Sequence, residues 1–575
     1  MNPFASYRML ITPLSPIHVG TGESYEPTNY VIEDGVLHEF DTGAVMAALS
    51  AADRKVLEEI GNRRPDTGMI EALQRFFYER REALMGHAIQ RIPVLPGVAG
   101  FYEKRVKQTA NREADGKKVV NRLEIDRTSF NPVTRLPVLF GSSLKGAMRT
   151  ALLDGVNGGR PAQERKGLHE FQGRLFRYFD ENARPHLSLE LDPMRLVQLS
   201  DAAWSGEPGL PAAQVHLAVN RKKVEVKDQQ GSVRKSQAEA KELYQILECT
   251  PGWRYRAFSG QINLQLVDGV AEKDRSGNRQ IPVANLRFDA AQVARACNDF
   301  YRPILEEECR LLHQRGFLDA TWYKAIQQFL ATTQTKLKRG DAFLLRVGRH
   351  SGAESVTLNG VRNIKIMKGK DEKPEYLEAA KTLWLAGDEK DQSTNLLPFG
   401  WLLVELQPLD GSATDWPELE AACRPHLSTA RAFKDKLAGQ QVRLEQAKAD
   451  AEARRREEEE KARQATEEEA QRRREDEEHQ ARLSALTPNL RRIEEFKADF
   501  TTRVEQLRGG KDRQNTDYHQ RAQKLAKDAL DGADWTTEEK CAAADAIAKW
   551  LPLVVERIDK EALKKLKLGT LRGNP

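Results

Sequence analysis

The chain has 575 residues, 40% of them hydrophobic and 30% charged, with a formal net charge of +5. At the usual scale of ~100–200 residues per domain, this length predicts several domains. No apolar run approaches the ~18 residues of a membrane-spanning helix, and no signal-peptide pattern opens the chain, so we expect a cytoplasmic protein without a membrane span.

Catalytic and metal-binding motifs are not evident in the sequence. There is no Walker loop, zincin helix or Gly-x-Ser-x-Gly elbow, and the histidines do not lie at metal-ligand spacing. The cysteines form no Cys-x-x-Cys pair, which gives little support to a zinc site or a disulfide framework; they are Cys249, Cys297, Cys309, Cys423 and Cys541. We therefore expect no catalytic residue, no metal and no cofactor.

The first part of the chain predicts a mixed α and β region. A strand is expected at residues 8–14 and a hairpin at 29–40, and apolar residues at helical spacing follow over 41–92. Residues 103–127 are rich in Lys and Arg and carry almost no large apolar side chains, which predicts a protruding or mobile loop.

The most informative stretch runs from a short apolar strand into a helix start. Residues 136–140 predict the strand, Gly141 permits a tight or left-handed turn, and Ser142 or Ser143 can cap a helix that begins at Leu144. The first N–H groups of such a helix have no partner within it.

Two cations, Lys145 and Arg149, are four residues apart on one face of this predicted helix. Together with the free N–H groups, they favour a site for a phosphate group. The alternative is a capped amphipathic helix with two solvated cations.

An earlier glycine-bearing loop, with Gly20 and Gly22, directly follows a predicted strand end that carries His18. The imidazole can serve as a general base or stack on a nucleotide, and a structural histidine beside a turn is the alternative. A lone Gly-x-Gly often marks only a turn.

A third glycine-bearing loop lies between Gly348 and Gly352, after a predicted strand that includes Arg346. Backbone N–H groups, the cation of Arg349 and the imidazole of His350 converge on this short loop, which favours anion binding. A hairpin loop with incidental charge is the alternative.

A second cation-rich arm covers residues 220–242 and includes Arg221 and Lys222. Three glycine-bearing loops and two basic arms suit a nucleic-acid backbone better than a small metabolite. Because the arms carry few aromatic residues, we expect recognition through phosphate and shape rather than base stacking.

The composition changes after about residue 411. Between 441 and 485 large aliphatic side chains almost vanish, and opposite charges recur at helical spacing, as in Glu457 with Lys461 and Glu469 with Arg473. Such pairs add ~0.2–0.5 kcal/mol each and in series support an isolated helix. A disordered segment is the alternative, because the same composition resists collapse.

The expected fold class is α+β over the first 410 residues, followed by an all-helical part. Helices are also expected within the α+β part, over 289–338. The predicted divisions are an N-terminal region at 1–240, a second region at 241–410, a connector at 411–440, a single charged helix at 441–485 and a small helical module at 486–575.

Several motifs in chain order resemble the repeat-associated mysterious protein (RAMP) superfamily of CRISPR systems, and within it the family of the fifth Csm subunit of type III-A effector complexes. The most specific is Gly-Ser-Ser-Leu-Lys-Gly-Ala-x-Arg. The others are Leu14-Ser-Pro-Ile-His-Val-Gly-Thr-Gly22, Asp192-Pro-Met-Arg, Leu199-Ser-Asp-Ala, Asn220-Arg-Lys, Glu248-Cys-Thr-Pro-Gly and Leu345-Arg-Val-Gly-Arg-His-Ser-Gly.

This resemblance implies tandem ferredoxin-like, RRM-related folds and a non-catalytic, RNA-binding subunit. Its implied role is to cap the backbone filament at the CRISPR RNA 3′ end and to support CRISPR RNA maturation and antiviral interference. CRISPR RNA and neighbouring Csm backbone subunits are the implied partners, and host ribonucleases in 3′-end trimming remain open. The rival reading is an endoribonuclease that processes precursor CRISPR RNA, with His18 or His350 as base and Lys145 stabilising charge.

Two features depart from the family. The related backbone subunits that cut target RNA carry an acidic residue where this chain has Thr28-Asn29-Tyr30, so we expect no target cleavage. The family also usually ends near the equivalent of Leu406. The charged helix and helical module beyond it are expected either to recruit another protein or to act as a spacer.

Overall fold

The computed structural model describes all residues except 1–3, 107–122, 162–167, 177–183, 185–187, 190, 268–269, 368–372, 410, 412–413 and 574–575. The chain forms two compact units, Met1–Ala449 and Asp450–Pro575. Most of the predicted basic loop at 103–127 lies outside the described residues. None of the helices that are described has the length and apolar character needed to span a membrane.

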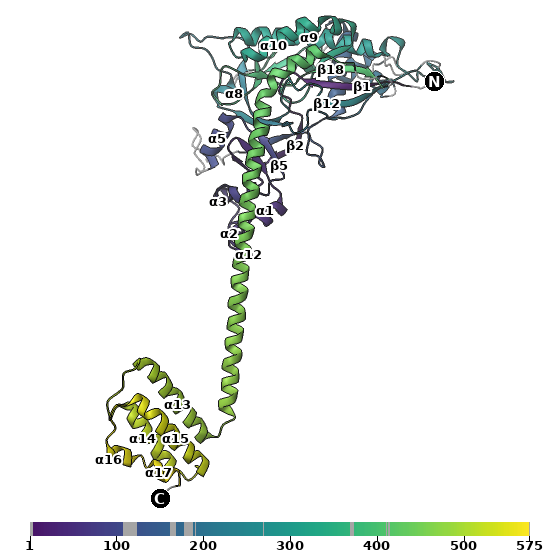
Figure 1. Ribbon diagram of the computed structural model, residues 1–575. Coiled ribbons are helices and arrows are strands. Elements are labelled where there is room, and N and C mark those ends of the chain that lie inside the picture. The colour runs from purple at the N-terminus through teal and green to yellow at the C-terminus, as the bar shows by residue number, and fades with distance from the viewer. Residues whose placement is uncertain are drawn as a thin grey trace. The chain divides into compact units, whose positions relative to one another are not determined.

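The first unit mixes helices with two large sheets (Figure 1). The larger sheet has the order β13-β18-β1-β12-β9-β7, with β8 also paired to β12, and every pair is antiparallel. Its strands are β1 (Phe4–Pro13), β7 (Val138–Leu139), β8 (Val197–Leu199), β9 (Ala202–Trp204), β12 (Phe258–Gln265), β13 (Ala342–Arg346) and β18 (Trp401–Pro408).

The second large sheet has the order β17-β16-β10-β11-β6-β2. Only β11 with β6 is a parallel pair among the pairs described in this sheet. Its strands are β2 (Gly20–Tyr25), β6 (Ile125–Thr128), β10 (Gln214–Lys222), β11 (Tyr244–Cys249), β16 (Thr382–Gly387) and β17 (Leu397–Pro398).

Both large sheets combine strands from the two sides of residue 240. Met9 in β1 pairs with Gly260 on one side and with Leu406 on the other. In the second sheet, Val219 pairs with Tyr244 and with Leu385. The division expected at residue 240 therefore does not separate the two sheets, because each sheet pairs strands from both sides of that residue.

Helices cover the sheets, and α9 and α10 lie along one side of the larger sheet (Figure 1). The region predicted to be helical at 289–338 forms these two helices. The helices before α12 are α1 (Thr42–Ala48), α2 (Ala51–Gly61), α3 (Thr67–Glu79), α4 (Arg81–Met85), α5 (Pro96–Val106), α6 (Gly141–Asn157), α7 (Leu168–Phe176), α8 (Gln237–Ala240), α9 (Ala290–Gln314), α10 (Ala320–Arg339) and α11 (Pro417–Cys423). Two small sheets add β3 (Tyr30–Glu33), β4 (Val36–Glu39), β5 (Gln90–Pro93), β14 (Ile364–Ile366) and β15 (Glu375–Leu377).

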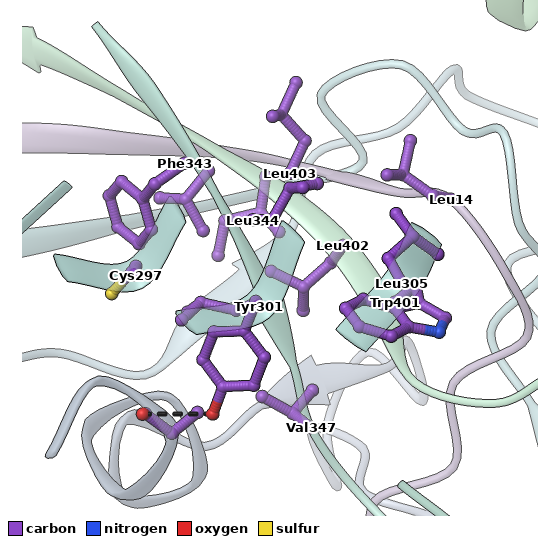
Figure 2. Packing of buried hydrophobic residues seen from close by; sticks show 14 of the residues in the cluster. Leu14, Cys297, Tyr301, Leu305, Phe343, Leu344, Val347, Trp401, Leu402 and Leu403 are labelled. Atoms are coloured by element: carbon purple, nitrogen blue, oxygen red, sulfur yellow. Dashed lines mark hydrogen bonds between the residues drawn. The ribbon is translucent and has the colours of Figure 1, made fainter. Parts of the chain in front are cut away.

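The main core lies between α9 and the strands β13 and β18, as Figure 2 shows. Leu344 and Leu403 are fully buried there, and burial of each such side chain is worth ~1.5–3 kcal/mol. Tyr301 of α9 donates its hydroxyl hydrogen to the carbonyl of Ala147 at 3.1 Å. The core therefore fixes α6, which carries the most specific sequence motif, against α9.

The segment predicted as a connector at 411–440 contributes to this core. Trp416, Leu419 and Cys423 are at most 3% exposed and belong to the same apolar cluster as the strands of the larger sheet. After α11 a short 3-10 turn, η4 (Arg424–Leu427), leads directly into α12 (Ser428–Ser484).

The charged segment forms one continuous helix, α12, which starts before residue 441. Its side chains are almost all exposed, and Ala430 and Gln440 are its buried residues. Ion pairs spaced four residues apart follow the exposed part, including Lys461 with Glu457 at 2.7 Å and Arg473 with Glu469 at 3.6 Å. Both pairs are among those expected from the sequence.

The second unit is helical from Pro488 onward. Amphipathic helices bury Phe500, Ile547 and Val554 completely in a core of their own. The helices are α13 (Pro488–Leu507), α14 (Asp517–Asp531), α15 (Thr537–Val554), α16 (Lys560–Lys565) and α17 (Leu568–Leu571).

Candidate nucleic-acid interface

Two of the three glycine-bearing loops pack directly against each other. The N–H of Arg349 donates to the carbonyl of His18 at 2.8 Å. Gly348 has φ of +82°, and a Cβ at this position would clash with the same carbonyl. Glycine is therefore required here both by the backbone conformation and by the close approach of the two loops.

His18 lies inside this junction. Its ring is fully buried, and Nδ1 is 2.7 Å from the carbonyl oxygen of Glu248. Burial lowers the pKa of His18, so the neutral ring is favoured. Gly20 and Gly22 lie outside the junction, are exposed, and Gly22 has φ of +84°.

Strand β7, which precedes the glycine-bearing turn at Gly141, is linked to the same junction by Ser129. The N–H of Ser129 donates to the carbonyl of Val19 at 2.6 Å, and its carbonyl accepts from the N–H of Val138 at 2.9 Å. Its hydroxyl also bonds the carbonyl of Val138. These contacts link the loop at 18–22 to β7, which leads directly into α6. The structure thus connects all three predicted loops.

The buried carboxyl group of Glu248 forms hydrogen bonds with residues next to the junction. Its oxygens accept hydrogen bonds from the Tyr25 hydroxyl and from the N–H of Thr128, both at 3.1 Å. Burial raises the pKa of Glu248 to about 7, and the nearby Arg127 opposes that rise. With its oxygens occupied by protein donors, this carboxyl group has a structural role.

The start of α6 differs from the sequence prediction. The helix begins at Gly141, Phe140 is its N-cap, and no serine side chain caps it. The N–H of Gly141 donates to the carboxylate of Asp201 at 2.7 Å. Gly141 does not have a left-handed conformation; a Cβ there would come within 2.8 Å of the Ser200 carbonyl oxygen. The prediction of a serine cap was wrong, because a distant carboxylate already satisfies this helix start.

The two cations of α6 have different environments. Arg149 donates to Asp192 at 2.7 Å and to Gln172 at 3.2 Å. Lys145 is partly buried and has no hydrogen bond or ion pair with any other described residue. Burial lowers the pKa of Lys145, the nearby carboxylate of Asp192 opposes this shift, and Arg149 adds to it. Lys145 therefore lies near Asp192 but makes no direct ion pair with a described residue, while Ser142 and Ser143 flank the helix start as exposed and half-buried side chains.

The third loop presents one exposed cation. The side chain of Arg349 is 42% exposed and pairs with Asp126 at 2.5 Å. His350 is stacked on Trp384 with ring centroids 5.0 Å apart, and its Nε2 lies 2.8 Å from the side-chain oxygen of Gln245. Burial lowers the pKa of His350 to about 3, and Arg349 adds to the effect.

Two arginines predicted to contact RNA point into the protein. Arg346 is 2% exposed and pairs with the buried Glu308 at 2.7 Å, and Gly352 lies against its guanidinium. Arg221 is 3% exposed and donates to the carbonyl of Gln392 at 2.6 Å. Their contact with RNA stays a prediction, but protein groups already occupy both guanidiniums.

Lys222 follows Arg221 and is half-buried. Burial lowers its pKa, and the neighbouring cation of Arg234 contributes in the same direction. The carboxylate of Glu239 opposes both effects, so Lys222 already has a protein anion nearby.

Asp192 and Asp201 are the residues whose importance the sequence analysis did not assign. Both lay within quoted motifs, and both turn out to hold α6, one through Arg149 and the other through Gly141. Across the described residues, no cluster of three or more His, Cys, Asp or Glu side chains is arranged to hold a metal ion. The exposed chemistry of the region includes the cation of Arg349 and the partly buried cation of Lys145, which suits phosphate.

Comparison with known protein families gives one match. Residues 10–290 match the family model of the RAMP superfamily. This range contains the loops at 18–22 and 141–146 and ends before the loop at 348–352. No curated protein matched the sequence.

Two solved structures show a distant similarity. One is a chain of the cryo-EM structure of a Csm–crRNA–target RNA ternary complex in a type III-A CRISPR-Cas system, at 15% identity and a TM-score of 0.40, covering 70% of this chain and 100% of that chain. The other is the crystal structure of T. onnurineus Csm5, at 15% identity and a TM-score of 0.37, covering 69% of this chain and 99% of that one. Both TM-scores are low.

Proposed function

Since this chain belongs to the RAMP superfamily over residues 10–290, we propose that it is a non-catalytic, RNA-binding subunit of a type III-A CRISPR effector complex. The observation that carries the proposal is the convergence of the three glycine-bearing motifs, where Lys145 makes no direct ion pair with a described residue and the side chain of Arg349 is 42% exposed. Cations placed in this way hold a phosphate backbone without reading its sequence.

Within that complex, the finer role is to cap the backbone filament at the 3′ end of CRISPR RNA and to support its maturation. The two large sheets are then the tandem ferredoxin-like halves. CRISPR RNA and a backbone subunit are the partners, as the chains similar to this one come from a Csm–crRNA–target RNA complex and from Csm5.

The surroundings of the two candidate bases, His18 and His350, support a non-catalytic role. His18 is fully buried, and His350 is stacked on Trp384 and has a pKa of about 3. A general base must reach the proton that it abstracts and has its best pKa near the working pH. Neither imidazole meets both conditions.

Fluorescence anisotropy with labelled CRISPR repeat RNA tests the binding surface. Lys145→Gln and Arg349→Gln are expected to weaken binding for all RNA sequences alike, and each lost phosphate contact reduces the salt slope by about 1. Arg455→Gln is the matched control, because it removes one exposed cation on α12 that pairs with Glu459. Equal effects of all three variants would contradict the proposed surface.

Two further assays test the remaining parts. Incubation of the purified chain with repeat RNA in the presence of a chelator is expected to leave the RNA intact. Specific cleavage that His18→Ala or His350→Ala abolishes would instead establish the endoribonuclease.

In the reconstituted complex, a photoreactive nucleotide is expected to crosslink to this chain from the 3′ end of CRISPR RNA and not from the 5′ end.

A further inference from the structure

A cleft of about 890 Å³ lies in the first unit, apart from the glycine loops of the candidate interface. Strands β10, β16 and β17 of the second large sheet line it, and the first turns of α12 form a further wall through Thr429 and Phe433. Its volume falls within the ~300–1,000 Å³ of typical small-molecule sites.

Aromatic rings line part of the cleft. Trp253 stacks on His426 with ring centroids 5.1 Å apart and planes 11° from parallel. The backbone of Trp253 has φ of +55°, unusual for a bulky residue, and its N–H is held by the Pro13 carbonyl at 2.7 Å. Trp322 is also part of the wall, fixed by a 2.7 Å bond from Nε1 to the carbonyl of Leu14. These bonds fix the positions of the two tryptophans, which are 2% and 3% exposed.

Three polar side chains that line the cleft have unpaired donors or acceptors. Nε2 of His216, Nε1 of Trp253 and Nε of Arg254 have no hydrogen-bond partner among the described residues, although these residues are at most 8% exposed. A buried polar atom without a partner is costly, and each such atom calls for an explanation. These atoms are closed off from solvent, so a ligand in the cleft reaches them only after the side chains turn toward it.

Arg254 is the cation of this group and has no carboxylate partner in the part of the chain that is described. Among the described residues its guanidinium makes one hydrogen bond, a long one of 3.4 Å to the carbonyl of His426. The carboxylates on the walls are engaged elsewhere: Asp34 accepts a 3.4 Å bond from the side-chain amide of Gln440, Asp319 accepts from the N–H of Trp322, and Asp388 accepts from the N–H of Gly97. Asp319 and Asp388 bond to helix starts, which favour negative charge. Arg254 therefore remains available to an anion.

We propose that this cleft binds one nucleotide, with its base against the aromatic wall and its phosphate toward Arg254. The inference rests on the RNA-binding function proposed above and adds a subsite to it. Base stacking on aromatic rings and a guanidinium on phosphate are the contacts by which proteins hold an unstacked nucleotide. The nucleotide can belong to the bound RNA or be a free mononucleotide.

Calorimetric titration of the full chain with uridine and adenosine 5′-monophosphates, and with the matching nucleosides, tests the pocket. Thr429→Trp fills the cleft from α12 and is expected to weaken nucleotide binding about tenfold or more. Ala432→Trp is the control, because this exposed residue is on the same helix and does not line the cleft. Arg254→Met is expected to abolish the advantage of the nucleotide over its nucleoside.

Repeat RNA with single 4-thiouridine substitutions identifies the source of the nucleotide. Crosslinks to residues 251–254 or 426–433, lost in Thr429→Trp, assign the subsite to RNA. Mononucleotide binding without such crosslinks assigns it to a free nucleotide. A thermal melt like that of the wild type shows that Thr429→Trp is folded; if its nucleotide affinity is then unchanged, the inference is overturned.

The proposed function and the subsite fail in different ways. If the wild type binds repeat RNA but neither mononucleotide, and gives no crosslink at these segments, the subsite is overturned and the RNA-binding function stands. If mononucleotides bind and repeat RNA does not, the RNA-binding function is overturned and the cleft is a site for a free nucleotide.

Discussion

The same ion pair, arginine with glutamate, occurs in two opposite settings in this protein. Arg346 and Glu308 are 2.7 Å apart in the core of the first unit, with side chains 1% and 5% exposed. Arg473 and Glu469 are 3.6 Å apart on α12, with side chains 77% and 71% exposed. Burial, rather than residue type, sets what each pair contributes.

The buried pair is enclosed in further hydrogen bonds. Glu308 also accepts from Nε1 of Trp401 at 3.0 Å, and Arg346 donates to the carbonyl of Phe399 at 2.9 Å. Charges removed from water are tolerated only when they are paired and bonded in this way. The exposed pair stays hydrated and contributes a few tenths of a kcal/mol, so α12 depends on many such pairs in series.

The largest expected effect comes from breaking the buried pair. Glu308→Ala leaves the Arg346 guanidinium buried and unpaired, and we expect a loss of about 3–5 kcal/mol in the unfolding free energy. Glu469→Ala on α12, the matched control, should cost less than about 0.5 kcal/mol. Urea unfolding followed by tryptophan fluorescence measures both. Similar losses for the two variants would contradict the comparison.

The buried imidazole of His38 extends the comparison to the dependence of stability on pH. His38 is 1% exposed, neither ring nitrogen has a hydrogen-bond partner among the described residues, and burial, aided by Arg91, lowers its pKa to about 3. The unfolded chain therefore binds the extra proton between pH ~6.5 and ~3, and the folded state loses stability as pH falls through that window.

His38→Leu removes this dependence without losing a hydrogen bond. We expect the variant to lose less stability than the wild type between pH 7 and pH 4, by at most about 4 kcal/mol. Unfolding curves at the two pH values measure the difference. An unchanged pH dependence in the variant would show that His38 does not titrate as a buried neutral ring.

Two glycines sharpen the contrast between the interior and α12. Gly348→Ala combines a left-handed backbone with a clash against the His18 carbonyl, and we expect a loss of roughly 1–3 kcal/mol. Gly439→Ala places a methyl group on α12 where no atom lies within 4 Å, and should stabilise the helix by about 1 kcal/mol. Thermal unfolding and circular dichroism measure the two effects, and shifts of the same sign would be inconsistent with these environments.

The smallest effect concerns salt. A peptide of residues 443–484 should be helical alone, because its ion pairs each add ~0.2–0.5 kcal/mol. Raising the ionic strength to 1 M screens exposed charges, so its helicity should fall. Circular dichroism across a salt series measures the change. Helicity that does not respond to salt would mean that helix propensity alone supports α12.

Local sequence patterns accounted for the helices more fully than for the sites. The helices expected over 289–338 correspond to α9 and α10, and the alternating charge after residue 441 corresponds to α12, because a helix is closed by bonds between residues four positions apart. Strand pairing is not local. That Met9 lies between Gly260 and Leu406 depended on contacts that no short window of sequence contains.

The sequence by itself determined where the glycine motifs and the charged helix lie, since both are written in neighbouring residues. Only the tertiary structure decided which cations remain available. Arg346 and Arg349 are three positions apart, yet one is enclosed by Glu308 and the other is 42% exposed. It also placed the Asp201 carboxylate at the start of α6. The physical reason is that the availability of a charge depends on its burial and on partners distant in the sequence. Neither can be read from the residue type or from its neighbours in the chain.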